Sequence, residues 1–121
     1  MIQVFNKNGE KIAESDSSIS VEIENSRRDC MVYIDYIKGS EDSITVSFGA
    51  KEVTTGEIFP IQQDDGSKLI NYERILDRGK YRIYIPMAEN EEALQVNITM
   101  NGDLSSEGNV KVWVIPIYQT F

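Results

Sequence analysis

Apolar and polar residues alternate with a period of two along most of this 121-residue chain. The alternation is clearest over residues 19–24, 43–48 and 94–101. Successive side chains of a β-strand point to opposite faces, so each of these segments has one buried face and one solvated face. The repeated pattern predicts an all-β fold.

Turn-forming residues separate the alternating segments at intervals of roughly ten residues, which is typical of a sandwich or barrel. Glycine and, to a lesser degree, asparagine adopt the positive φ that tight turns need. The turn signals are Asn8-Gly9, 38–40, 64–67, Arg78-Gly79 and 101–103. Strands are therefore expected near 2–6, 10–13, 19–25, 30–38, 42–51, 57–62, 68–75, 80–86, 93–101 and 109–118.

This number of strands folds most economically into two packed sheets. We predict a single domain over residues 1–121, a two-sheet antiparallel β-sandwich of the jelly-roll type with roughly 8–10 short strands. It would have an N-terminal hairpin over about residues 1–14 and an apolar C-terminal tail over about 115–121. Two helical alternatives stay open, one turn within 88–94 and a longer segment within 68–78.

The composition argues against several classes of function. The chain has no histidine, which removes the Ser-His-Asp and Cys-His constellations and the commonest metal ligand. Its 20 acidic and 12 basic residues give a net charge of −8, which disfavours binding to nucleic acid and to anionic membranes. The single cysteine, Cys30, lies among apolar residues and is expected to be a buried thiol. We predict a protein that is not an enzyme and has no cofactor.

Residues 1–5 lack the basic start and the long apolar stretch of a signal peptide, and no run approaches about 18 apolar residues. A cytoplasmic location is therefore expected unless the protein belongs to a virion.

Several acidic residues are candidates for functional sites. Asp35 lies inside an apolar strand and is a perturbed acid, a solvent-facing strand residue or a partner of one of the arginines. Asp64-Asp65-Gly66 and Asn101-Gly102-Asp103 resemble pieces of a calcium loop but lack its closing Glu, so turns are favoured. Glu89–Glu92 is read as a solvated loop. No metal site is predicted, although a carboxylate pair acting as in glycosidases stays open as an alternative.

Two predicted strands are apolar on both faces. In 30–37, Met31, Tyr33 and Ile37 occupy the face opposite Cys30 and Val32, and in 110–118 the second face carries Trp113, Ile115 and Ile117. Only one face of a strand in a sandwich meets the core, so the second needs a cover. That cover is either a segment of the same chain or another subunit. In the second case the interface residues are Tyr33, Trp113, Ile115, Ile117, Tyr118 and Phe121.

Aromatic residues also permit a different function. Six aromatic residues at strand positions could form a platform for stacking sugars, which would make the chain a carbohydrate-binding or adhesin-like module. They are Tyr33, Tyr36, Tyr72, Tyr81, Tyr84 and Trp113. A glycan is therefore kept as an alternative partner.

The segment Arg78–Pro86 (RGKYRIYIP) reads as a tight turn into a strand that ends at proline, and it is followed by the strand 94–100, the turn at Asn101-Gly102 and the strand 110–114. This order resembles the small β-sandwich proteins of tailed-phage virions, such as capsid decoration (cement) proteins and head or tail accessory domains. The resemblance covers roughly residues 40–118 and carries over no functional residue. It implies a virion structural protein that binds a major capsid or other virion protein and itself, often as a trimer.

Overall fold

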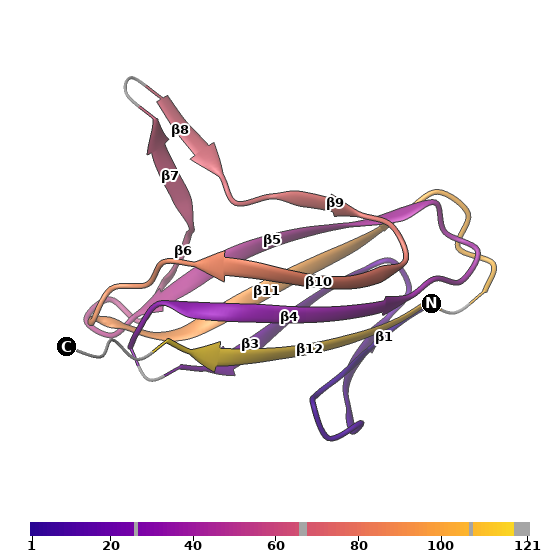
Figure 1. The fold of residues 1–121 in the computed structure, drawn as a ribbon, viewed down its shortest axis with the longest axis horizontal. Helices are drawn as coiled ribbons and strands as arrows, with labels where there is room; N and C mark the ends of the chain where they lie inside the picture. Colours follow the sequence, from indigo (N-terminus) through magenta and orange to yellow (C-terminus); the bar gives the residue numbers. More distant parts are fainter. Residues whose placement is uncertain (26, 66–67, 107, 118–121) are drawn as a thin grey trace.

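Two β-sheets face each other across an apolar core in the computed structural model of the chain (Figure 1). The structure describes residues 1–25, 27–65, 68–106 and 108–117, with the backbone alone for 63–65 and 68–71. In chain order the strands are β1 (Ile2–Phe5), β2 (Lys11–Ser15), β3 (Ser18–Glu24), β4 (Cys30–Ile37), β5 (Ser43–Glu52), β6 (Ile58–Pro60), β7 (Gln62–Asp65), β8 (Lys68–Asn71), β9 (Arg74–Leu76), β10 (Gly79–Ile85), β11 (Glu91–Asn101) and β12 (Gly108–Pro116).

Sheet A has the strand order β10-β4-β12-β1-β2, and sheet B has the order β3-β11-β5-β6 with β9 also paired to β5. Among the described residues every ladder is antiparallel except that between β1 and β12, which is parallel and begins with Ile2 opposite Gly108. The predicted all-β sandwich is confirmed, with this one parallel ladder added. The jelly-roll strand order stays a prediction.

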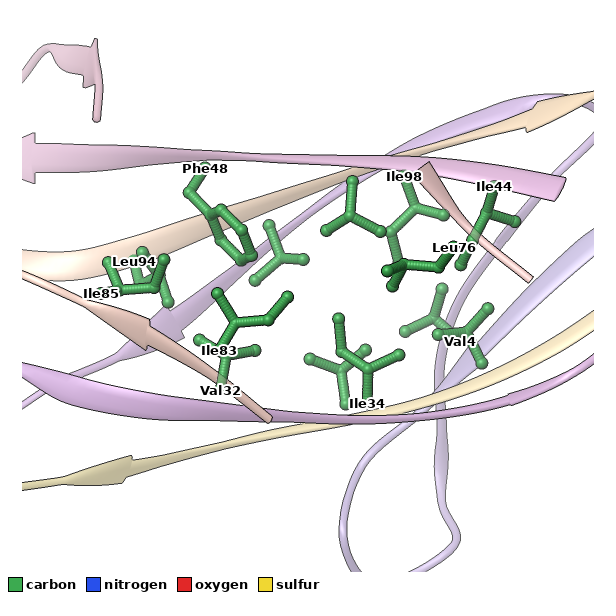
Figure 2. Close-up of a cluster of buried hydrophobic side chains, with 14 of the residues drawn as sticks. Val4, Val32, Ile34, Ile44, Phe48, Leu76, Ile83, Ile85, Leu94 and Ile98 are labelled. Carbon is green, nitrogen blue, oxygen red and sulfur yellow. The ribbon is translucent and has the colours of Figure 1, made fainter. Parts of the chain in front are cut away.

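The core follows from the period-two pattern. Phe48, Leu94 and Ile98 point inward from sheet B, and they meet side chains from sheet A such as Val32 and Ile34 (Figure 2). Cys30 belongs to the same buried cluster. Burial, with a further contribution from the charge of Asp29, raises the pKa of the Cys30 thiol to about 12, so the thiol is a protonated core group near neutral pH.

Two predicted strands are divided in the structure. The predicted strand 57–62 becomes β6 and β7, and the predicted strand 68–75 becomes β8 and β9. The reason is that, among the described residues, β7 and β8 pair only with each other and project from the body, after which β9 returns to pair with β5 (Figure 1). Both helical alternatives are wrong, because 88–94 is a turn entering β11 and 68–78 holds β8 and β9.

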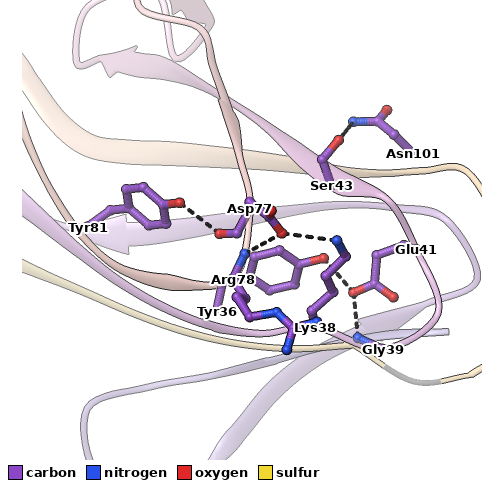
Figure 3. Close-up of polar contacts among 9 residues, drawn as sticks. All are labelled: Tyr36, Lys38, Gly39, Glu41, Ser43, Asp77, Arg78, Tyr81 and Asn101. Carbon is purple, nitrogen blue, oxygen red and sulfur yellow. Dashed lines mark hydrogen bonds and ion pairs between the residues drawn. The ribbon is translucent and has the colours of Figure 1, made fainter.

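Polar contacts join the β4–β5 connection to the β9–β10 connection. Lys38 Nζ lies 3.0 Å from Asp77 Oδ1, and the same oxygen accepts a hydrogen bond from Arg78 N at 2.7 Å (Figure 3). Tyr81 Oη donates to the Asp77 carbonyl at 2.8 Å. These contacts hold β10 beside β4 and so help to position the outer face of sheet A.

Candidate functional site

The outer face of sheet A carries aromatic side chains on its central strands. Cys30 and Val32 of β4 point into the core, so Tyr33 points outward, and the same parity places Trp113 of β12 outward. The β4–β12 register sets Tyr33 directly opposite Trp113. Their rings stack with centroids 5.6 Å apart and planes 13° apart. The stack links the middle of both strands across the sheet.

A second row of apolar side chains lies beside this stack. Met31 is the ladder neighbour of Ile115 on β12 and of Tyr84 on β10. Ile115 is 43% exposed and Tyr84 is 47% exposed, while Met31 is half-buried. We call the five residues of the two rows the outer strip: Met31, Tyr33, Tyr84, Trp113 and Ile115. Much of this apolar strip is therefore exposed to solvent and not covered by any described residue.

Charged residues border the outer strip on two sides, because the exposed Arg82 of β10 is the ladder neighbour of Tyr33 and a row of charged residues follows the stack. Lys80 of β10, Asp35 of β4 and Lys111 of β12 form the next row of the ladder. Lys111 Nζ lies 6.0 Å from the centre of the Trp113 ring, within the range of a cation–π contact. Asp35 is half-buried, and its neighbours in the two ladders are Lys80 and Lys111, so of the alternatives for Asp35 the arginine partner is the one that the ladders do not supply.

A hollow of about 270 Å³ adjoins the charged row. It is lined by Phe5 and Ile37 on its apolar side and by Asp35, Asn109 and Lys111 on its polar side. Asn109 Oδ1 is buried there without a hydrogen-bond partner among the described residues. The outer strip therefore continues into a concave region that could take a side chain from another molecule.

Tyr84 was not among the interface residues expected from the sequence. Its hydroxyl donates a hydrogen bond of 2.5 Å to Asp29 Oδ2, and Asp29 Oδ1 accepts from Met87 N at 2.8 Å. The hydrogen bond to Asp29 raises the pKa of Tyr84 to about 12 and keeps the hydroxyl protonated. The inward positions of Ile83 and Ile85 were the signal that could have placed Tyr84 outward.

The predicted interface residues are brought together only in part. Tyr33, Trp113 and Ile115 share the outer strip. Ile117 lies beyond the end of β12, half-buried, and its backbone N donates to the Asp29 carbonyl at 2.8 Å. Tyr118 and Phe121 lie outside the described residues.

Acidic side chains elsewhere gather at a further hollow, where Glu22, Glu24 and Glu92 lie together with Lys51. In the part of the chain that the structure describes, no group of three His, Cys, Asp or Glu side chains is placed to hold a metal ion. Asp103 instead accepts hydrogen bonds from the backbone N and hydroxyl of Ser105, and Glu91 accepts from Ala88 N. Residues Asp64 and Asp65 end β7, and the predicted turn residues Gly66 and Ser67 lie outside the described residues.

The chain matches no protein-family model, no curated protein and no solved structure. Across the described ranges, no helix has the length and apolar character needed to cross a membrane.

Proposed function

We propose that the chain is a non-enzymatic structural protein of a phage particle, of the capsid decoration type. In this proposal it binds copies of itself, as a trimer, and a major capsid or other virion protein. The outer strip on sheet A is the contact surface.

The observation that carries this proposal is the contrast between the two outer faces of the sandwich. The outer face of sheet B is polar along its central strands, where Ser47 and Thr45 of β5 lie opposite Asn97 and Thr99 of β11. The equivalent positions of sheet A carry the stacked Tyr33 and Trp113. Clustered, rigid aromatic side chains on one face only are characteristic of association surfaces.

The geometry of the aromatic pair favours a protein partner over the sugar-stacking alternative. Tyr33 and Trp113 stack on each other, so each ring uses one face on its neighbour instead of lying side by side as a platform. Ile115 and Met31 extend the surface with aliphatic groups, which pack against other apolar side chains. The neighbouring hollow gives the surface the pocket that central interface residues usually fill.

The virion part of the proposal rests on the resemblance of residues 40–118 to small virion sandwiches. The absence of histidine from the sequence supports a different part of the proposal, the non-enzymatic role.

Self-association is tested by size-exclusion chromatography with light scattering. We expect the wild-type chain to elute as an oligomer and Ile115→Asp to elute as a monomer, because a charge on this exposed strand position would be desolvated in the interface. Ile115 is partly exposed, so the variant retains the core and should fold.

Thr99→Asp is the matched control, because Thr99 is also an exposed outward residue of a central strand but lies on sheet B. It should leave the oligomer unchanged. A wild-type chain that is monomeric at high concentration would contradict self-association, and equal effects of the two variants would contradict the assignment of the surface.

The virion assignment has its own test. The gene is expected beside capsid and portal genes, and labelled chain is expected to bind shells assembled from the neighbouring capsid protein. Binding that survives Ile115→Asp at full strength would exclude the outer strip as the attachment surface.

A further inference from the structure

A separate pocket of about 260 Å³ lies on the outer face of sheet B, on the opposite side of the sandwich from the outer strip. Its floor is made by β5 and β11, and one wall comes from β6. The other wall is formed where the chain returns from the β7–β8 hairpin toward β9 (Figure 1). Its size is below that of sites for drug-sized ligands, so it suits one small ring.

A glycine keeps the floor of this pocket open. A Cβ at Gly49 would lie 2.7 Å from Ile58 Cγ2 and 3.4 Å from Gln95 Oε1. Any larger residue would therefore push Ile58 outward and fill the space beside Gln95.

The polar groups of the floor have unused hydrogen-bonding capacity. Neither the Gln95 amide nor the Ser47 hydroxyl makes a hydrogen bond to any described residue, although both side chains are half-buried. Asn97 Oδ1 accepts from Ser20 Oγ at 2.7 Å, which leaves the Asn97 amide NH₂ to donate. Side-by-side amide and hydroxyl groups supply the donors and acceptors that adjacent ligand hydroxyls need.

The walls are apolar where the floor is polar. Ile58 and Pro60 form one wall, and Tyr72 forms the other. Tyr72 is held by a hydrogen bond from its backbone N to the Ile61 carbonyl at 3.3 Å and by the Arg74 guanidinium, 5.9 Å from the ring centre. A sugar ring has this same division, with hydroxyls at its edge and C–H groups on its faces.

The charge of the lining selects against an anion. Among the described residues that line the pocket, Glu73 is charged and there is no lysine or arginine. A phosphate or carboxylate ligand would find no cation among the described lining residues, since the nearby Arg74 guanidinium lies against the Tyr72 ring, whereas a neutral polyol would not need one. We infer that this pocket binds a single neutral pyranose ring of a glycan. The inference does not depend on the outer strip.

The test is a titration of the ¹⁵N-labelled chain with the methyl glycosides of glucose, galactose, mannose and N-acetylglucosamine, followed by NMR. We expect saturable shifts for at least one glycoside, centred on β5, β6 and β11. Gln95→Ala should weaken that binding about three- to tenfold, the effect of losing one or two neutral hydrogen bonds. Because Gln95 has no partner among the described residues, its removal should leave the fold intact.

Thr99→Ala is the control, since it lies on the same strand and face as Asn97 but outside the pocket. It should bind as the wild type does, and so should Ile115→Asp on sheet A. The inference is overturned if none of the glycosides gives saturable shifts, if Gln95→Ala binds normally, or if Ile115→Asp abolishes binding.

Discussion

Among the described residues, Glu41 is the one charged residue that is buried, with 1% of its surface exposed. Its Oε1 accepts hydrogen bonds from Tyr36 Oη at 2.6 Å and Gly39 N at 3.0 Å, while Oε2 has no partner among the described residues (Figure 3). Burial alone raises the pKa of Glu41, but these hydrogen bonds favour the charged form and bring the pKa below its ordinary value of 4.5. A single tyrosine hydroxyl thus does much to keep a buried carboxylate charged.

Tyr36→Phe is expected to lower the free energy of unfolding by about 1–3 kcal/mol near neutral pH, because it removes a hydrogen bond to a buried charge. A carboxylate with a lowered folded-state pKa stabilises the fold above its ordinary pKa of 4.5, and this stabilisation is lost as the pH falls through the folded-state value. The difference in unfolding free energy between the wild type and Tyr36→Phe should therefore become smaller at acidic pH. Urea unfolding of both proteins across a pH series measures this difference.

Tyr81→Phe is the matched control for this measurement. Its hydroxyl donates to the Asp77 backbone carbonyl, which does not titrate. The loss of unfolding free energy caused by Tyr81→Phe should therefore be the same at each pH. An equally pH-independent cost for Tyr36→Phe would show that Glu41 is not held in its charged form by this hydroxyl.

At the scale of the element, β12 depends on the residue at its start. Gly108 N donates to the Met1 carbonyl at 3.0 Å and opens the parallel ladder with β1. Gly108 also lies against the Glu41 carboxylate, where an added Cβ would overlap Oε1. A side chain at this position would therefore have to displace the Glu41 carboxylate for the central strand of sheet A to keep its place between β4 and β1.

Gly108→Ala is expected to destabilise the fold by about 1–3 kcal/mol, as other overpacked sites do. In a Glu41→Ala background the same substitution should cost much less, because the carboxylate that it meets is gone. Denaturant unfolding of the two single variants and the double variant gives the coupling energy. Additive costs would contradict a direct clash between positions 41 and 108.

On the scale of the whole molecule, the sandwich has two unlike outer faces. Sheet A presents the stacked aromatic pair with Ile115 and Tyr84 exposed beside it, and sheet B presents serine, threonine and amide side chains around a small pocket. Our proposals assign a protein partner to the first face and a sugar ring to the second. A chain arranged in this way could attach by one face and display the other.

If the outer strip is a self-association surface, the thermal unfolding midpoint of the wild type should rise with protein concentration, because assembly stabilises only the folded chain. Ile115→Asp should remove this dependence, and Thr99→Asp should retain it. Scanning calorimetry over about a 100-fold range of concentration measures the effect. A midpoint that is independent of concentration for all three chains would contradict self-association.

The sequence by itself determined the class of fold and the parity of its strands. Alternation over 19–24, 43–48 and 94–101 is a local property, because each residue's face depends only on its neighbours along the strand. The same parity predicts that Tyr33 and Trp113 lie on the faces away from the core, without reference to strand pairing. Cys30 could be expected in the core for the same reason, and it lies there.

Strand pairing was decided only by the tertiary structure. The parallel ladder between β1 and β12 joins opposite ends of the chain, and no local pattern encodes such a partner. The stacking of Tyr33 on Trp113, the burial of Glu41 against Gly108 and the pocket between Gly49 and Gln95 each depend on the register of strands distant in sequence. Periodicity specifies which face a side chain occupies, whereas its neighbours on that face depend on long-range packing.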